Sequence, residues 1–301
     1  DIAANCATMN IIGIKVLKGP NYWSGYRKNL IEMKLDLGRF EELPTDKLPG
    51  FNQKLIALLP GLKTDHCSEG HEGGFVERLE RGTWLGHVIE HVALELQCMA
   101  EMDCGYGRTR STGTAGIYHV VFAYMYEDAG KLAATAAVRL VDALASGEDY
   151  DATKDLEDLK EIANEQKIPD FAELLINLAT ARKIPTRYDR KNATLLLGQG
   201  INQAKININN LTATEFQDEK EATTKAKDLL NSTFPKFNNA RIPVVAVTGT
   251  NGKTTTTRLI AHIAGQTGLS VGFTTTDGIY LNDKLLKAGD CSGPRSASVL
   301  L

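Results

Sequence analysis

The first half of the chain combines short apolar runs, bounded by glycine or charged residues, with long apolar stretches free of proline. Short runs of this kind predict strands, and long ones predict buried helices. We therefore expect strands at 11–18, 30–36 and 117–124, and helices at 55–59, 82–102 and 129–145. The stretch 105–114 is rich in glycine and threonine and is expected to be a loop. These elements predict an α+β N-terminal domain over residues 1–160.

The second half is more polar and begins with an acidic helical segment at 149–163, which is typical of a solvated connector. A helix is expected at 168–182 and a strand at 193–200, whereas the polar stretch 207–240 is the weakest candidate for a packed core. We interpret residues 161–240 as a connector. Residues 241–301 predict an α/β unit, in which strand 242–247, helix 253–266 and strand 270–274 form a parallel right-handed crossover.

A phosphate-binding loop is the strongest chemical signal in the sequence. The run Thr-Gly-Thr-Asn-Gly-Lys-Thr-Thr at 248–255 follows the expected strand and opens the expected helix, as such a loop requires. Its glycines let backbone N–H groups turn towards phosphates, and the helix N-terminus adds a positive dipole end. Lys253 would contact the β- and γ-phosphates of ATP, and the Thr254 hydroxyl would bind Mg²⁺. The nucleotide-binding residues expected here are Gly249, Thr250, Asn251, Gly252, Lys253, Thr254 and Thr255.

One position departs from the general phosphate-loop pattern, which places a glycine five residues before Gly252, where this chain has Val247. A glycine-rich turn without nucleotide is the alternative, but strand, loop, Lys-Thr pair and helix together favour a nucleotide. Thr276 and Asp277 follow the next strand, where ligands bind in open α/β sheets. An Asp-Gly turn explains these two residues equally well.

The long apolar helix carries one narrow polar stripe formed by His87, Glu90 and His91, which share a helix face at i, i+3 and i+4. Burying such groups without partners costs about 2–7 kcal/mol each, so something must satisfy them. The spacing His-x-x-Glu-His is that of inverted zinc hydrolases, in which two histidines bind the metal and the glutamate is the general base. A hydrogen-bonded structural cluster is the alternative.

A catalytic zinc site would need a third protein ligand besides His87 and His91. We expect this ligand to be Cys67, with His66 and then Glu95 as the next candidates. Glu90 would be the catalytic base of the zinc site, and Lys253 the catalytic cation of the phosphate loop.

Composition and charge restrict the class of protein. The chain has 301 residues, of which 43% are hydrophobic and 24% charged, with a net charge of −3, so a globular protein that binds neither nucleic acid nor membranes is expected. The five scattered cysteines favour a reducing cytoplasm over a disulfide framework. The first residue is Asp1, which is consistent with a fragment boundary.

Many short motifs occur in order along the chain. Those of the N-terminal part are residues 19–24, 36–37, 49–51, 67–68, 73–75 and 105–110, and those of the C-terminal part are residues 274–280, 289–290 and 293–298. The phosphate loop has the Gly-Thr-Asn-Gly-Lys-Thr form, which resembles the Mur ligases. Together the motifs resemble the cyanophycin synthetases, over residues 11–206 and again over 229–301.

The resemblance implies ATP-dependent amide ligation of aspartate and arginine into cyanophycin, multi-L-arginyl-poly-L-aspartate, with ATP and Mg²⁺ as cofactors and the polymer or a primer as partner. It also implies a homo-oligomer. In that family an ATP-grasp domain adds aspartate, and here 197–206 resembles its entry. Only about 35 residues are left for its core, against about 100–150 for a usual domain. We therefore expect an α+β N-terminal domain, a connector and a truncated Mur ligase-like α/β unit, which alone does not elongate the polymer.

Two other functions fit the same residues. Some cyanophycin synthetases are thought to use this N-terminal region as a zinc peptidase that clips polymer into primers, and the ligand set here is compatible with that activity. The region would otherwise be a non-catalytic polymer-binding module. Arg108 and Arg110, on a glycine-flanked segment, are candidate contacts for polymer carboxylates or simply solvated side chains.

Overall fold

The structure, a computed structural model, describes residues 8–26, 29–209, 219–235 and 238–301. These residues divide into two compact units, Asp1–Lys167 and Ile168–Leu301. Each unit has a hydrophobic core of its own. Among the described residues, no helix combines the length and the hydropathy needed to cross a membrane.

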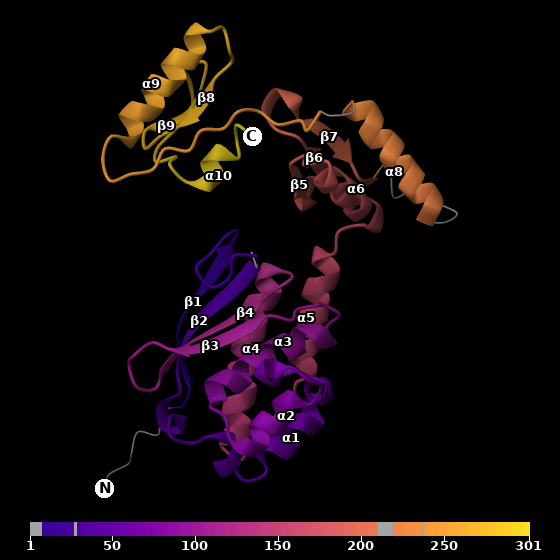
Figure 1. Cartoon of the computed structure of the whole chain (residues 1–301), viewed down its shortest axis with the longest axis vertical. Helices are drawn as coiled ribbons and strands as arrows, with labels where there is room; N and C mark the ends of the chain where they lie inside the picture. Colours follow the sequence, from indigo (N-terminus) through magenta and orange to yellow (C-terminus); the bar gives the residue numbers. More distant parts are fainter. Residues whose placement is uncertain (1–7, 27–28, 210–218, 236–237) are drawn as a thin grey trace. The chain divides into compact units, whose positions relative to one another are not determined.

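The first unit is built on a four-stranded antiparallel sheet in the order β1-β2-β4-β3 (Figure 1). Its strands are β1 (Asn10–Lys18), β2 (Asn29–Asp36), β3 (Gly107–Ser111) and β4 (Ile117–Ala123). Alternate residues of β2, Ile31, Met33 and Leu35, are fully buried in the core. This period of two places one face of the sheet against the helices.

Helices α3 (Leu85–Met99) and α4 (Glu127–Ala145) pack against each other and against this sheet. Helix α5 (Thr153–Gln166) packs on both, while α1 (Phe51–Leu58) and α2 (Gly74–Arg81) lie beside the segments that lead into α3. Short 3₁₀ helices at Gly38–Phe40, Thr45–Lys47, Pro60–Lys63 and Cys67–Glu69 connect these elements. The α+β architecture predicted for the N-terminal region is confirmed.

Two details of the predicted first unit are wrong. The stretch 105–114 is not a loop throughout, because Gly107–Ser111 forms β3, whose five residues all pair with β4. Backbone hydrogen bonding along an edge strand does not require apolar side chains, and charged residues are common there. Helix 82–102 begins only at Leu85, since Gly82 ends the unpredicted α2 with a φ of 99°.

The second unit begins with a small α+β core. Strands β5 (Thr186–Asp189), β6 (Thr194–Leu197) and β7 (Ala204–Asn207) form an antiparallel sheet. Helices α6 (Asp170–Ala181) and α8 (Glu219–Thr233) pack against each other beside it. Short 3₁₀ helices lie at Arg190–Asn192 and Gly200–Asn202. Part of the polar stretch 207–240 (residues 210–218 and 236–237) lies outside the described residues.

The stretch 207–240 was the weakest candidate for a packed core, but the described part of α8 contributes to one. Ala226, Leu230 and the following Phe234 are buried together with Leu175 of α6. A few apolar residues, spaced by about one helical turn, are sufficient to cover a small core despite a polar average.

Leu230→Ala is expected to destabilise the second unit by about 2–5 kcal/mol, because the truncation removes a buried side chain and leaves a cavity. Lys227→Ala, on the exposed side of the same helix, is the control and should change stability by no more than about 0.5 kcal/mol. Urea denaturation of the full chain measures both. Equal midpoints for the two variants would show that α8 does not contribute to this core.

The C-terminal part of the second unit contains α9 (Lys253–Gln266), β8 (Gly272–Thr274), β9 (Gly278–Leu281), β10 (Lys284–Ala288) and the short α10 (Pro294–Ala297). Its sheet is antiparallel, in the order β10-β9-β8. The predicted strand 242–247 does not form, and the predicted parallel crossover is therefore wrong. A buried parallel strand needs paired neighbours and two covered faces. Among the described residues this run has neither, and Val244 and Val245 are 60% and 66% exposed.

Candidate functional site: a cysteine–histidine cluster on α3

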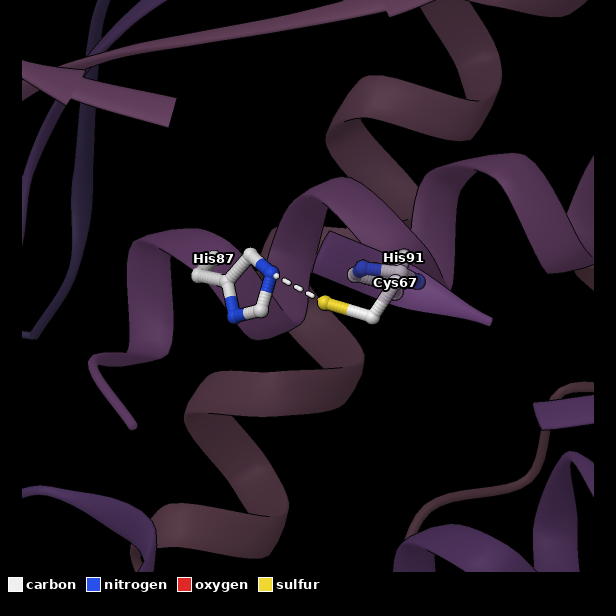
Figure 2. Close-up of side chains that lie close together, drawn as sticks. All are labelled: Cys67, His87 and His91. Atoms are coloured by element: carbon white, nitrogen blue, oxygen red, sulfur yellow. Dashed lines mark hydrogen bonds between the residues drawn. The ribbon is translucent and has the colours of Figure 1, made fainter. Parts of the chain in front are cut away.

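Helix α3 presents two histidines to the segment that precedes α2. His87 and His91 are one helical turn apart, and their ring centroids are separated by 4.8 Å. Cys67, at the start of a short 3₁₀ helix, lies between them, with its Sγ 3.3 Å from His87 Nε2 (Figure 2). Taking one ligand atom from each residue, all three atoms lie within 4.8 Å of one another. The sequence predicted this grouping of two histidines with Cys67.

The backbone around Cys67 is arranged to hold the thiol against the helix. Cys67 has a φ of 52°, a left-handed conformation that is uncommon for a residue with a side chain. The segment is tied down by hydrogen bonds from Gly70 N to His66 O and from Phe75 N to Asp65 O. The Phe75 ring stacks on His91 with centroids 4.0 Å apart. Strained backbone of this kind persists where the surrounding structure enforces it, and such places are often functional.

Each histidine has a second partner at its other ring nitrogen. His91 Nδ1 lies 2.7 Å from Asp65 Oδ2, and His87 Nδ1 lies 3.0 Å from Thr83 Oγ1. Sequence reasoning missed both partners. Asp65 lies two residues before the predicted ligand Cys67, but nothing in its local pattern marks it, and Thr83 precedes α3 without a motif.

The electrostatics of the cluster favour a thiolate beside a protonated imidazole. Burial alone would raise the pKa of Cys67, but hydrogen bonds from His87 and His91 lower it to about 5. Burial would lower the pKa of His91, but its hydrogen bonds with Asp65 and Cys67 raise it to about 9. A thiolate and an imidazole are the forms that bind zinc once the imidazole has lost its proton.

Glu90 lies outside this cluster of ligand atoms. Its carboxylate accepts a hydrogen bond of 2.7 Å from Thr109 Oγ1 on β3, and its side chain packs closely against Gly107. Burial raises the pKa of Glu90. The other two candidates for a third ligand, His66 and Glu95, are not in the group that the described residues form. Glu95 instead packs against Gly61.

The phosphate-loop residues lie at the N-terminus of α9, as the sequence predicted. Lys253 Nζ donates hydrogen bonds to Gly249 O and Thr250 O, at 2.7 and 3.1 Å. Gly249 and Gly252 have φ values of 150° and 78°, which favour glycine. Thr250, Asn251 and Thr255 are exposed on the loop and the first turn.

Thr276 and Asp277, the other two candidate residues of this unit, contact side chains in the first two turns of α9. The hydroxyl of Thr276 lies 3.4 Å from that of Thr254, and Asp277 forms an ion pair of 3.1 Å with Arg258 of α9. Two hydroxyl oxygens this close are compatible with one Mg²⁺ ion, which prefers oxygen ligands. The alternatives for these two residues were a ligand site and a turn. The proximity of Thr276 to the phosphate loop supports a role in ligand binding for this residue, whereas Asp277 has a structural partner in Arg258.

Comparison with known proteins gives two family matches, one around the cysteine–histidine cluster and one around the phosphate loop. The family described as "Cyanophycin synthase-like N-terminal domain" matches residues 32–146, which contain the whole cysteine–histidine cluster. The family described as "Mur ligase middle domain" matches residues 247–296, which contain the phosphate loop. Cyanophycin synthetase from Synechocystis sp. is 44% identical over 223 residues, covering 71% of this chain and 26% of that protein.

The chain is a relative of the cyanophycin synthetases. Further cyanophycin synthetases, from Geminocystis herdmanii and Trichormus variabilis, are 42% and 39% identical, over 71% and 72% of this chain. The resemblance read from the sequence motifs is thus confirmed. The chain spans about a quarter of the length of these cyanophycin synthetases, 26% and 25% respectively.

Proposed function

We propose that this chain serves the ATP-dependent ligation of aspartate and arginine into cyanophycin, contributing a polymer-handling N-terminal domain and a nucleotide-binding loop. The observation that carries the proposal is the loop itself, with Lys253 folded over its carbonyls and the Thr254 and Thr276 hydroxyls 3.4 Å apart. The names of the relatives and the Mur ligase match over 247–296 support the same reaction class.

The residues of the loop fit ATP and Mg²⁺. The exposed N–H groups at the start of α9 and the positive end of its dipole would bind phosphate oxygens. Lys253 would exchange its two carbonyl partners for the β- and γ-phosphates, and Thr254 with Thr276 would hold the metal ion. When bound, ATP supplies the phosphoryl group that activates a carboxylate for attack by an amine.

The partners proposed for the N-terminal domain are the polymer or a primer. Arg108 and Arg110 are exposed and alternate along the edge strand β3, so both point to the same face of the sheet. Guanidinium groups in this arrangement are suited to carboxylates of the polymer. Cytoplasmic location and assembly into a homo-oligomer are part of the same proposal.

We expect this chain to bind ATP with Mg²⁺ and to bind a cyanophycin primer, yet not to add aspartate to it. The physical reason is that 161–240 is too short for an ATP-grasp domain of about 100–150 residues. Equilibrium binding of fluorescent ATP and of a synthetic aspartate–arginine primer tests the first part, and incorporation of radiolabelled aspartate tests the second. A chain that binds neither ATP nor the primer would contradict the proposed function. Incorporation of aspartate would contradict the prediction that this chain alone does not elongate the polymer.

A second candidate function is favoured by the cysteine–histidine cluster. Cys67, His87 and His91 supply one sulfur and two nitrogen donors, a set that suits Zn²⁺. When bound, zinc would activate water for hydrolysis of an amide bond, with Glu90 as the general base. In this candidate function the N-terminal domain clips polymer to make primers; the His-x-x-Glu-His spacing predicts the zinc hydrolase, and the resemblance to cyanophycin synthetases implies the substrate. The raised pKa of Glu90 supports a role in proton transfer.

A further inference from the structure

Each histidine of the cluster forms a hydrogen bond with a side chain that is not a proposed zinc ligand. Asp65, on the loop before α2, contacts His91 Nδ1, and Thr83, in the turn before α3, contacts His87 Nδ1. In each ring the nitrogen so occupied is Nδ1, which leaves Nε2 for a third group. Cys67 Sγ lies 3.3 Å from Nε2 of His87, so the free nitrogen of that ring faces the thiol.

We propose that Asp65 and Thr83 are positioning residues of a zinc site formed by Cys67, His87 and His91, and that Asp65 contributes the larger part. The inference rests on the zinc site of the second candidate function and assigns two residues that the motif does not contain. Metal-binding histidines generally donate their other ring N–H to a carboxylate, carbonyl or hydroxyl, which fixes the ring orientation and the tautomer.

The tautomer is the first consequence of these contacts. A neutral imidazole carries its proton on one nitrogen only, and a hydrogen-bond acceptor beside Nδ1 keeps the proton there. A carboxylate oxygen can only accept, so Asp65 Oδ2 keeps the proton on Nδ1 of His91, and the Thr83 hydroxyl is able to accept from Nδ1 of His87 in the same way. With the proton on Nδ1, the lone pair of the neutral ring is on Nε2, and Nε2 of His87 lies 3.3 Å from Cys67 Sγ. Asp65 and Thr83 therefore fix the orientation of both rings, and Nε2 becomes the ligand atom for a zinc ion when the ring is neutral.

The two partners differ in charge and in burial. The Asp65 side chain is 37% exposed and carries a carboxylate, whereas Thr83 is 4% exposed and offers a neutral hydroxyl. A carboxylate raises the basicity of the imidazole it contacts, while a hydroxyl mainly orients it. The Phe75 ring, stacked on His91 at 4.0 Å, further restricts that ring. Removal of the Asp65 charge should thus weaken zinc binding more than removal of the Thr83 hydroxyl.

Asp65 also belongs to the segment that carries the third ligand. It lies two residues before Cys67, and its backbone carbonyl accepts a hydrogen bond from Phe75 N. One short segment therefore supplies both a ligand, Cys67, and the residue that orients a second ligand, His91. Thr83 is anchored separately, because its backbone N–H donates to Thr45 Oγ1 and its carbonyl accepts from Thr45 N.

The test is the zinc affinity of the full chain, measured by competition with a chromophoric chelator. Asp65→Asn should weaken zinc binding about 10- to 100-fold, the usual effect of losing such a partner. Thr83→Val should weaken it less, and Thr83→Ser, which keeps the hydroxyl, should restore wild-type affinity. Glu72→Gln removes the same charge from an exposed position seven residues from Asp65 and should leave the affinity unchanged.

The outcomes separate this inference from the site on which it rests. A wild-type chain that binds no zinc would overturn the zinc site itself. Tight binding by the wild type together with unchanged affinity of both Asp65→Asn and Thr83→Val would overturn only the positioning roles. Cobalt(II) is the second probe: the thiolate-to-cobalt absorption of Cys67 should persist in Asp65→Asn at saturating metal. If Asp65→Asn fails to fold, equal affinities of Thr83→Val and Thr83→Ser overturn the proposal.

Discussion

Cys67→Ser is expected to weaken zinc binding by a factor of about 100 or more. Structural zinc sites with four ligands bind with about 10–16 kcal/mol, which corresponds to about 3 kcal/mol for each ligand. Every 1.4 kcal/mol is a factor of ten in affinity. A serine hydroxyl at neutral pH is not an anionic sulfur ligand, so the replacement should remove the contribution of Cys67 almost entirely. His87→Ala and His91→Ala should have effects of similar size.

Glu90→Gln is the matched control for this experiment. Glu90 lies one residue before His91 on the same helix, but its carboxylate contacts Thr109 instead of the cluster. The variant should retain about one equivalent of zinc and lose the cleavage of aspartate–arginine polymer. Elemental analysis and a cleavage assay on the purified full chain measure the two quantities. A wild-type chain that contains no zinc would contradict the metal site. A Cys67→Ser variant that contains as much zinc as the wild type would also contradict it.

The sequence was sufficient to predict the elements that bury a continuous apolar face. Helix α4 and strand β2 were predicted to within a few residues because their apolar residues repeat at the helical and strand periods. Strand β3 was not, since Arg108, Thr109 and Arg110 have no apolar alternation and are held by pairing with β4. Pairing with a distant strand is decided by tertiary structure, which a local pattern does not contain.

The same distinction applies to the candidate site. The i, i+4 spacing of His87 and His91 follows from helix geometry alone, so their proximity could be predicted. Cys67 was expected from the glycine-rich turn that follows it, and the structure brings it to the histidines. Asp65 and Thr83 could not be predicted, because their contacts depend on how the loop before α2 and the turn before α3 meet.

The phosphate loop shows a local motif that forms without its expected strand. The turn at Gly252 and the folded-back Lys253 depend on glycine conformations and on hydrogen bonds within the loop. The apolar run 242–247, by contrast, needs partners on both edges and both faces, which the described residues do not provide. Local chemistry was therefore predicted more accurately here than the arrangement of strands.

Lys253→Met is expected to weaken ATP binding about 10- to 100-fold. Hydrogen bonds to charged groups contribute about 1.5–3 kcal/mol, and this variant removes the ammonium group that would contact the β- and γ-phosphates while keeping a long apolar side chain. Lys287→Met removes the same charge from an exposed position on β10 of the same unit and should leave the affinity unchanged. Titration with a fluorescent ATP analogue in the presence of Mg²⁺ measures all three proteins.

The dependence on nucleotide distinguishes a contact with phosphate from a general loss of charge or of folding. If Lys253 contacts the terminal phosphates, Lys253→Met should affect ATP strongly, ADP less and AMP hardly at all. Thr254→Val should instead reduce the enhancement of ATP binding by Mg²⁺, because it removes one of the two hydroxyls that lie 3.4 Å apart. An equal loss for ATP and AMP in Lys253→Met would indicate that the lysine supports the loop through Gly249 and Thr250 and does not bind phosphate.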